Sequence, residues 1–162
     1  MSWLQEQKAK ADKEQADREA EKDAKKAAED HRDQRSRDRA KRERETKFAD
    51  LEGRMCWQEL DGKRRKLGAF HSEVKNATII FFAGEVKLGE IQYWLRESER
   101  YDNDGCSYGT GDYYETSNMW LYLSYIKKDG TKAEPRVGGE CAYYGHASDD
   151  YLGEYLLNFV KP

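Results

Sequence analysis

Hydrophobic and polar positions divide the chain into two contrasting parts. Between Ser2 and Phe48 the only large apolar side chains are Trp3, Leu4 and Phe48 itself, and no glycine or proline occurs before Gly53. The stretch consists mainly of Ala, Gln, Glu, Lys and Arg, which are strong helix formers. The pattern predicts one long helix over residues 1–50, with Ser2 as its N-cap and Gln5 at the capping-box position.

Charge spacing supports a solvated helix and leaves its packing open. Thirteen of its i,i+4 charge pairs are attractive and seven are repulsive, a surplus that stabilises the helix by about 1–3 kcal/mol. A narrow alanine stripe follows one face of its first half. Three interpretations follow: an isolated charged helix, a coiled coil with a second copy or a partner groove, or disorder in isolation.

Residues 51–162 show the short alternations and turn signals of a β-rich domain. Met55–Leu60 and Lys63–Phe70 flank Asp61-Gly62, a strong hairpin signal, and the cations of residues 63–66 predict an exposed rim. Ala77–Ala83 is an unbroken apolar run that predicts a central strand covered on both faces.

Further elements follow from the same signals. They are strands within Glu85–Glu97 with a turn near Gly89, a strand over Asn118–Lys127, a turn at Asp129-Gly130, an edge strand over Thr131–Val137 that contains Pro135, and a strand over Glu140–Tyr144. Asp149 or Asp150 is expected to cap a short helix with apolar positions Leu152, Tyr155, Leu156 and Phe159. The fold class is therefore α+β, with an extended helix over 1–50 and an antiparallel β-sheet domain with a C-terminal helix over 51–162.

Charge and cysteine content narrow the functional classes. The net charge of −3 is distributed as −2 over residues 1–30, +3 over 31–50 and −4 over 51–162, which argues against a basic nucleic-acid-binding domain as a whole. No apolar run is long enough to cross a membrane, and the N-terminus lacks a signal-peptide pattern. Three widely spaced cysteines are expected to be free thiols in the cytoplasm.

Motifs that carry chemistry are missing. The sequence has no phosphate-binding loop, no His-Glu-x-x-His and no paired Cys-x-x-Cys. A zinc site would need scattered ligands, and Cys141 with His146 lacks a third group that would orient a nucleophile. We therefore predict no catalytic residue, no cofactor, no metal and no enzymatic activity.

One stretch has the composition of a binding loop. Residues 101–114 contain Tyr, Asp, Gly, Ser, Thr, Asn and one Cys with no apolar period, and they carry a formal charge of −3. Tyrosines among small polar residues are typical of binding loops, although a solvated connector has the same composition. The predicted partner-binding residues are Tyr101, Asp102, Asp104, Tyr108, Asp112, Tyr113 and Tyr114.

The second half of the helix suggests an opposite partner. Arg32, Arg35, Arg39 and Arg42 fall within about 80° on a helical wheel, where they could contact phosphates or an acidic partner. Acidic residues interleave with them and no aromatic residue lies among them to stack on bases, so a solvated face is the competing interpretation.

These observations favour a non-enzymatic protein-protein interaction module. Chains of this kind include adaptors, virion components and phage-encoded inhibitors, and self-association through the helix is a further expectation. The alternatives are a nucleic-acid or ribonucleoprotein-associated protein that uses the arginine stripe, and a small enzyme with an unrecognised site near residues 101–114.

Overall fold

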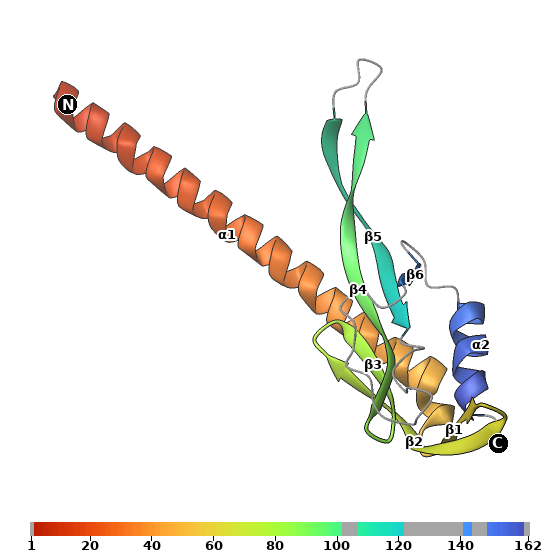
Figure 1. Cartoon of the computed structure of the whole chain (residues 1–162). Helices are drawn as coiled ribbons and strands as arrows, with labels where there is room; N and C mark the ends of the chain where they lie inside the picture. The colour runs from red at the N-terminus through yellow and green to blue at the C-terminus, as the bar shows by residue number, and fades with distance from the viewer. Residues whose placement is uncertain (1, 102–106, 122–140, 144–148, 161–162) are drawn as a thin grey trace. The chain divides into compact units, whose positions relative to one another are not determined.

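The computed structural model describes residues 2–101, 107–121, 141–143 and 149–160 (Figure 1). Its elements are α1 (Trp3–Glu43), a π-helical turn η1 (Arg44–Phe48), a 3-10 turn η2 (Ala49–Leu51), β1 (Met55–Leu60), β2 (Lys63–Lys75), β3 (Thr78–Ala83), β4 (Val86–Tyr101), β5 (Ser107–Leu121), β6 (Cys141–Tyr143) and α2 (Asp149–Val160). The predicted α+β class is confirmed. The turn at Asp129-Gly130 and the strand over Thr131–Val137 lie outside the described residues.

The structure separates into two compact units whose boundary lies within α1, between Gln34 and Arg35. In the first unit the helix begins as expected, because the Ser2 amide donates a 2.9 Å hydrogen bond to Gln5 Oε1. Trp3 and Leu4 are 70% and 71% exposed. The side chains of residues 2–31 are all exposed, as expected for a helix without an apolar face.

The second unit includes the end of α1, which the sequence pattern had assigned to the extended helix. Ser36, Ala40 and Phe48 are buried, with at most 6% of each residue exposed. Ser36 and Ala40 are four positions apart and therefore lie on the same face of the helix. The sequence pattern had also suggested that residues 51–162 fold without this part of α1, and truncation of the chain would test that suggestion.

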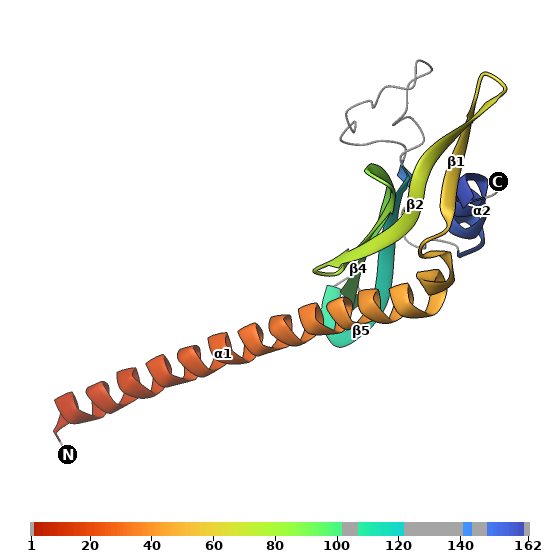
Figure 2. The same ribbon diagram turned by 90° about the horizontal axis from the view of Figure 1, so that it is seen from below.

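Within the described residues the sheet has six antiparallel strands in the order β1-β2-β3-β4-β5-β6. The predicted hairpin at Asp61-Gly62 is confirmed. Both residues have positive φ (51° and 73°), as a two-residue type I′ turn requires. Figure 2 shows the end of α1 and the short α2 beside this curled sheet.

Two expectations about the central strands need correction. β4 runs unbroken from Val86 to Tyr101, so the turn predicted near Gly89 is wrong, and the reversal lies at Gly84-Glu85 instead. Position 89 requires a glycine for another reason. A Cβ there would lie 2.7 Å from the Trp120 carbonyl oxygen of the neighbouring strand. In β3 burial alternates, with Ile79, Phe81 and Ala83 buried and the intervening residues half-buried, so its two faces are not equally covered.

One face of the sheet forms the core. Ile79, Ile91 and Met119 lie in register across three strands, each at most 2% exposed. The ring of Phe48 packs edge-on against Phe81 with centroids 4.7 Å apart. The predicted C-terminal helix is confirmed as α2, whose Tyr155 hydroxyl donates a 2.9 Å hydrogen bond to the Leu88 carbonyl.

A change of helical pitch brings Phe48 into this core. On a regular α-helix, Phe48 would lie about 80° around the axis from Ala40, eight residues earlier. The wider π-helical turn over Arg44–Phe48 reduces that separation. The Thr46 hydroxyl donates a 2.7 Å hydrogen bond to the Arg42 carbonyl within the same turn.

Cys56 provides a test of the core through its thiol chemistry. The residue is 0% exposed, and burial raises the pKa of its thiol to about 11. Its thiol ionises near pH 8.5 in an unfolded chain, so we expect its contribution to stability to be lost as pH rises from about 9 towards 11. In a Cys106→Ser, Cys141→Ser variant, mass spectrometry with an alkylating reagent should show labelling of Cys56 only on unfolding. Labelling of the folded protein at the rate of a free thiol would contradict this burial.

Candidate functional site

The strongest candidate surface is a two-stranded extension of the sheet. β3 pairs with β4 only as far as Gln92, whereas β4 and β5 remain paired as far as Tyr101 and Ser107. We call residues 95–101 and 107–115 the β4–β5 ribbon. Figure 1 shows it projecting beyond the other strands.

The ribbon replaces most of the predicted loop over residues 101–114, and that part of the expectation is wrong. In the strand register, Tyr101 lies opposite Ser107, Tyr108 opposite Arg100, Tyr113 opposite Glu97 and Tyr114 opposite Arg96. Asp112 falls at the bulge where the register shifts between Glu97 and Glu99. Asp102 and Asp104 lie outside the described residues.

Beyond residues 95–97, which fall within the predicted strands of Glu85–Glu97, the ribbon escaped prediction because its residues do not alternate between apolar and polar. A strand is recognised from that alternation, which arises where one face packs on a core. Tyr and Thr do favour strands, and both occur repeatedly over residues 108–116. The strand propensity of these Tyr and Thr residues was therefore the signal from which β5 could have been predicted.

The ribbon segment is acidic and open along its edges. Residues 95–115 contain two arginines and six carboxylates: Arg96, Arg100, Glu97, Glu99, Asp102, Asp104, Asp112 and Glu115. Tyr114 is 44% exposed. Within the described residues no third strand pairs with β4 beyond Gln92 or with β5 before Met119. Such edges present backbone donors and acceptors to a partner.

The base of the ribbon is tied to the end of α1. Arg39 Nε lies 3.5 Å from Glu115 Oε2, and Arg39 Nη1 donates a 3.3 Å hydrogen bond to the Thr116 carbonyl. The Arg39 guanidinium also lies 4.6 Å from the centre of the Tyr93 ring. Arg35 adds a 3.7 Å ion pair with Glu115. We call these residues the Arg39 clamp.

The clamp changes how the predicted arginine stripe is interpreted. Arg35 and Arg39 contact the sheet, and the Arg39 side chain is only 19% exposed. Arg32, in the first unit, lies 4.0 Å from Glu29, and Arg42 is exposed. The four arginines therefore do not form one solvated stripe, because the two middle members are engaged within the compact unit.

A second polar cluster, which sequence reasoning missed, joins η1 to β2. Arg44 Nε donates a 2.9 Å hydrogen bond to Ser72 Oγ. Glu52 Oε1 accepts hydrogen bonds from the Ser72 hydroxyl at 2.6 Å and the Ser72 amide at 3.1 Å. Arg44 Nη2 lies 3.3 Å from the same carboxylate oxygen. Ser72 is buried, so we interpret the cluster as a structural link between helix and sheet.

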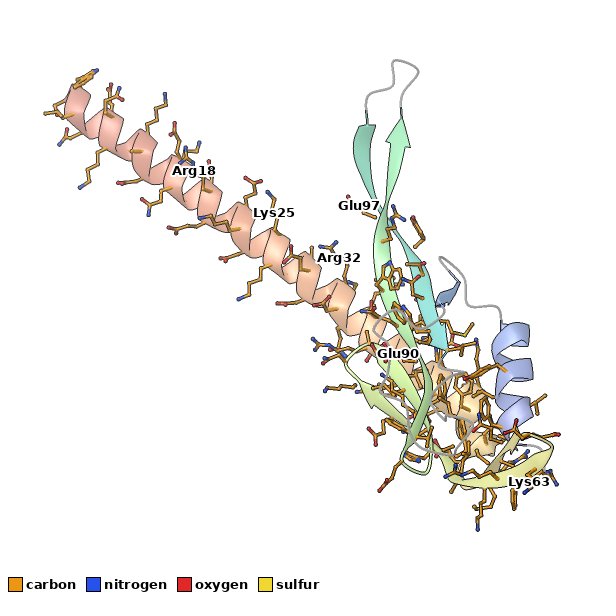
Figure 3. The ribbon with its side chains drawn as sticks, in the orientation of Figure 1. Arg18, Lys25, Arg32, Lys63, Glu90 and Glu97 are labelled. Atoms are coloured by element: carbon orange, nitrogen blue, oxygen red, sulfur yellow. The ribbon has the colours of Figure 1, made fainter. Side chains whose placement is uncertain are left out.

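The opposite end of the compact unit is basic. Lys63, Arg64, Arg65 and Lys66 are exposed at the start of β2, as the sequence predicted. Figure 3 labels Lys63 at this end and Glu97 on the ribbon. The unit therefore presents opposite charges on two separate hairpins.

The other candidate chemistry finds little support in the described part of the chain. No group of three or more His, Cys, Asp and Glu side chains there could hold a metal, and no helix there is long and apolar enough to cross a membrane. His71 stacks on Phe82 with ring centroids 4.9 Å apart. Cys106 and His146 lie outside the described residues.

Comparison of the chain with protein-family models, with curated proteins and with solved structures finds no match.

Proposed function

We propose that the chain is a non-enzymatic protein-interaction module whose β4–β5 ribbon binds a basic segment of another protein. The observation that carries this proposal is the ribbon itself: two long paired strands, acidic in composition, extend beyond the sheet and are clamped at their base by Arg39.

The energetics of a ribbon favour a partner. A two-stranded hairpin is marginally stable in water, whereas three strands with a covered face are stable. A bound extended segment would supply the missing strand through main-chain hydrogen bonds. The tyrosines of the ribbon would add contact area at a low cost in side-chain entropy.

Charge selects the kind of segment. Apart from Glu115, which is paired with Arg35 and Arg39, residues 95–115 carry five carboxylates and two arginines. This acidic surplus would repel a phosphate backbone and attract lysine and arginine side chains. The Arg39 clamp supports this role because it holds the base of the ribbon in place before binding, which lowers the entropy lost on association.

The first unit would act separately from the ribbon. Its exposed helix carries charge on every side, and the exposed residues Trp3 and Leu4 lie at its N-terminal end. In this proposal it spaces the compact unit from another molecule or pairs with a second copy, as in an adaptor or an inhibitor of a larger complex.

Replacement of Tyr108, Tyr113 and Tyr114 by alanine tests the proposal. We expect at least a tenfold loss of affinity for the captured partner, because aromatic anchors commonly contribute about 2 kcal/mol or more each. The partner would be captured from the source cells with the full chain, purified, and titrated by calorimetry. Thermal melting of the variant should stay close to that of the wild type.

Matched variants separate the rings from the charges. Tyr→Phe at the same three positions should retain most of the affinity, whereas Glu97→Gln with Asp112→Asn should weaken binding mainly at low salt. Unchanged affinity in the alanine variant would show that the ribbon is not the binding surface.

A further inference from the structure

The basic hairpin has an architecture of its own. β2 pairs with β3 only from Phe70 onward, whereas β1 and β2 are paired over Trp57–Leu60 and Lys63–Lys66. Residues 57–66 therefore form a second two-stranded segment, which we call the β1–β2 ribbon, and α2 contacts strand β1. It is closed by the tight turn at Asp61-Gly62, whose positive φ angles fix its geometry.

The β1–β2 ribbon carries cations on both faces. Successive side chains of a strand point to opposite faces, so Lys63 and Arg65 share one face while Arg64 and Lys66 share the other. Same-face cations are about 6.6 Å apart along the strand. All four residues are exposed, and only Glu59 and Asp61 oppose their charge within residues 57–66.

An aromatic ring lies on one of these faces. Trp57 is directly opposite Lys66 in the register, and Glu59 is opposite Arg64. The Arg64 guanidinium lies 5.6 Å from the centre of the half-buried Trp57 ring. One face of the ribbon therefore presents the Trp57 ring beside Arg64 and Lys66, with the Glu59 carboxylate on the same face.

We propose that the β1–β2 ribbon is a binding site for single-stranded nucleic acid. Its cations would contact phosphates, and the Trp57 ring would stack on a base, the combination that single-strand-binding surfaces use. The unpaired bases of a single strand can reach an indole ring, whereas duplex bases are stacked inside the helix and an acidic peptide has no base to stack.

This site is distinct from the two surfaces already described. The arginine stripe of α1 is divided by the Arg39 clamp, so its middle members cannot contact phosphates without breaking contacts with Glu115. The acidic β4–β5 ribbon repels phosphates and lies at the other hairpin. The proposal does not depend on the protein-binding role of that ribbon.

Fluorescence anisotropy with the full chain and a labelled short oligothymidylate tests the proposal. Trp57→Leu should weaken binding by about 5- to 150-fold, which corresponds to the 1–3 kcal/mol of one stacked base. Arg64→Gln with Lys66→Gln, on the face that carries Trp57, should reduce the slope of log K against log salt by about 1.4, since each phosphate contact to a single strand contributes about 0.7. Both variants should melt like the wild type.

The controls match charge and separate the two ribbons. Lys8→Gln with Lys10→Gln removes the same charge from the exposed helix and should leave affinity unchanged. The triple tyrosine variant of the β4–β5 ribbon should bind the oligonucleotide normally, so failure of one proposal leaves the other intact.

Four results would overturn the proposal. They are no oligonucleotide binding at low salt, tighter binding of a duplex of the same length or of a polyglutamate peptide, equal losses in the helix control, and unchanged affinity in a folded Trp57→Leu protein.

Discussion

Removal of residues 1–34 should leave the unfolding transition of the remaining chain nearly unchanged, whereas removal of residues 1–47 should weaken it severely or abolish it. The first truncation ends at the boundary between the compact units. The second also removes the part of α1 that buries Ser36 and Ala40 and that supplies Arg39 to the ribbon. Chemical unfolding, followed by circular dichroism and by tryptophan fluorescence, measures the stability of both truncated proteins.

The expected loss of stability on removal of residues 1–47 follows from the contacts that this truncation removes. Without Arg44, the Ser72 hydroxyl and the Glu52 carboxylate each lose a charged hydrogen-bond partner, and a hydrogen bond to a charged group contributes about 1.5–3 kcal/mol. The sheet face beneath Ala40 also becomes exposed to water. Domains of this size have about 5–15 kcal/mol of stability in total, so these losses together remove much of it.

Two outcomes decide between the domain boundary after residue 50, which the sequence pattern suggested, and the boundary between Gln34 and Arg35 in the structure. If residues 48–162 melt as cooperatively as residues 35–162, the sheet domain does not need the helix, as the sequence pattern suggested. If residues 35–162 already fail to fold, the first unit contributes to stability in a way that its exposed side chains do not explain.

The parts of the fold that sequence predicted well are those with a local physical signal. Asp61-Gly62 specifies a type I′ turn by its backbone preference, and the apolar run around Ile79 and Phe81 requires burial. The spacing of Tyr155, Leu156 and Phe159 places them on one side of a helix, and all three are buried. In each case neighbouring residues alone specify the structure.

The parts that sequence missed depend on distant neighbours. Ser36 and Ala40 are small and give no apolar period, yet both are buried, and Ala40 belongs to the same core cluster as Phe81 and Ile91. The β4–β5 ribbon is held by backbone pairing between two segments, and its residues show no alternation of apolar and polar side chains that would reveal either strand in the sequence. In the sequence Arg39 looks like any charged residue on a helix surface. Its role depends on Glu115 and Thr116, which are distant in the sequence and contact it in the fold.

Phe48→Ala should lower the free energy of unfolding by about 3–5 kcal/mol, the usual cost of removing a buried phenyl ring. The residue is 5% exposed, and its ring meets Phe81 edge-on at 4.7 Å. Aromatic pairs of this geometry add about 0.5–1.5 kcal/mol beyond area burial, so the upper part of the range is expected. Urea unfolding with fitted midpoints and slopes gives the measurement.

Two matched variants give this result its meaning. Trp3→Ala removes a larger ring at the start of α1, yet its 70% exposure predicts a change within about 0.5 kcal/mol. Phe48→Leu keeps most of the volume and should lose clearly less than Phe48→Ala, because it leaves a smaller cavity. A Phe48→Ala protein as stable as Trp3→Ala would place Phe48 outside the core. It would also contradict the π-helical turn as the device that joins α1 to the sheet, since Phe48 is the only large apolar side chain between Leu4 and Leu51.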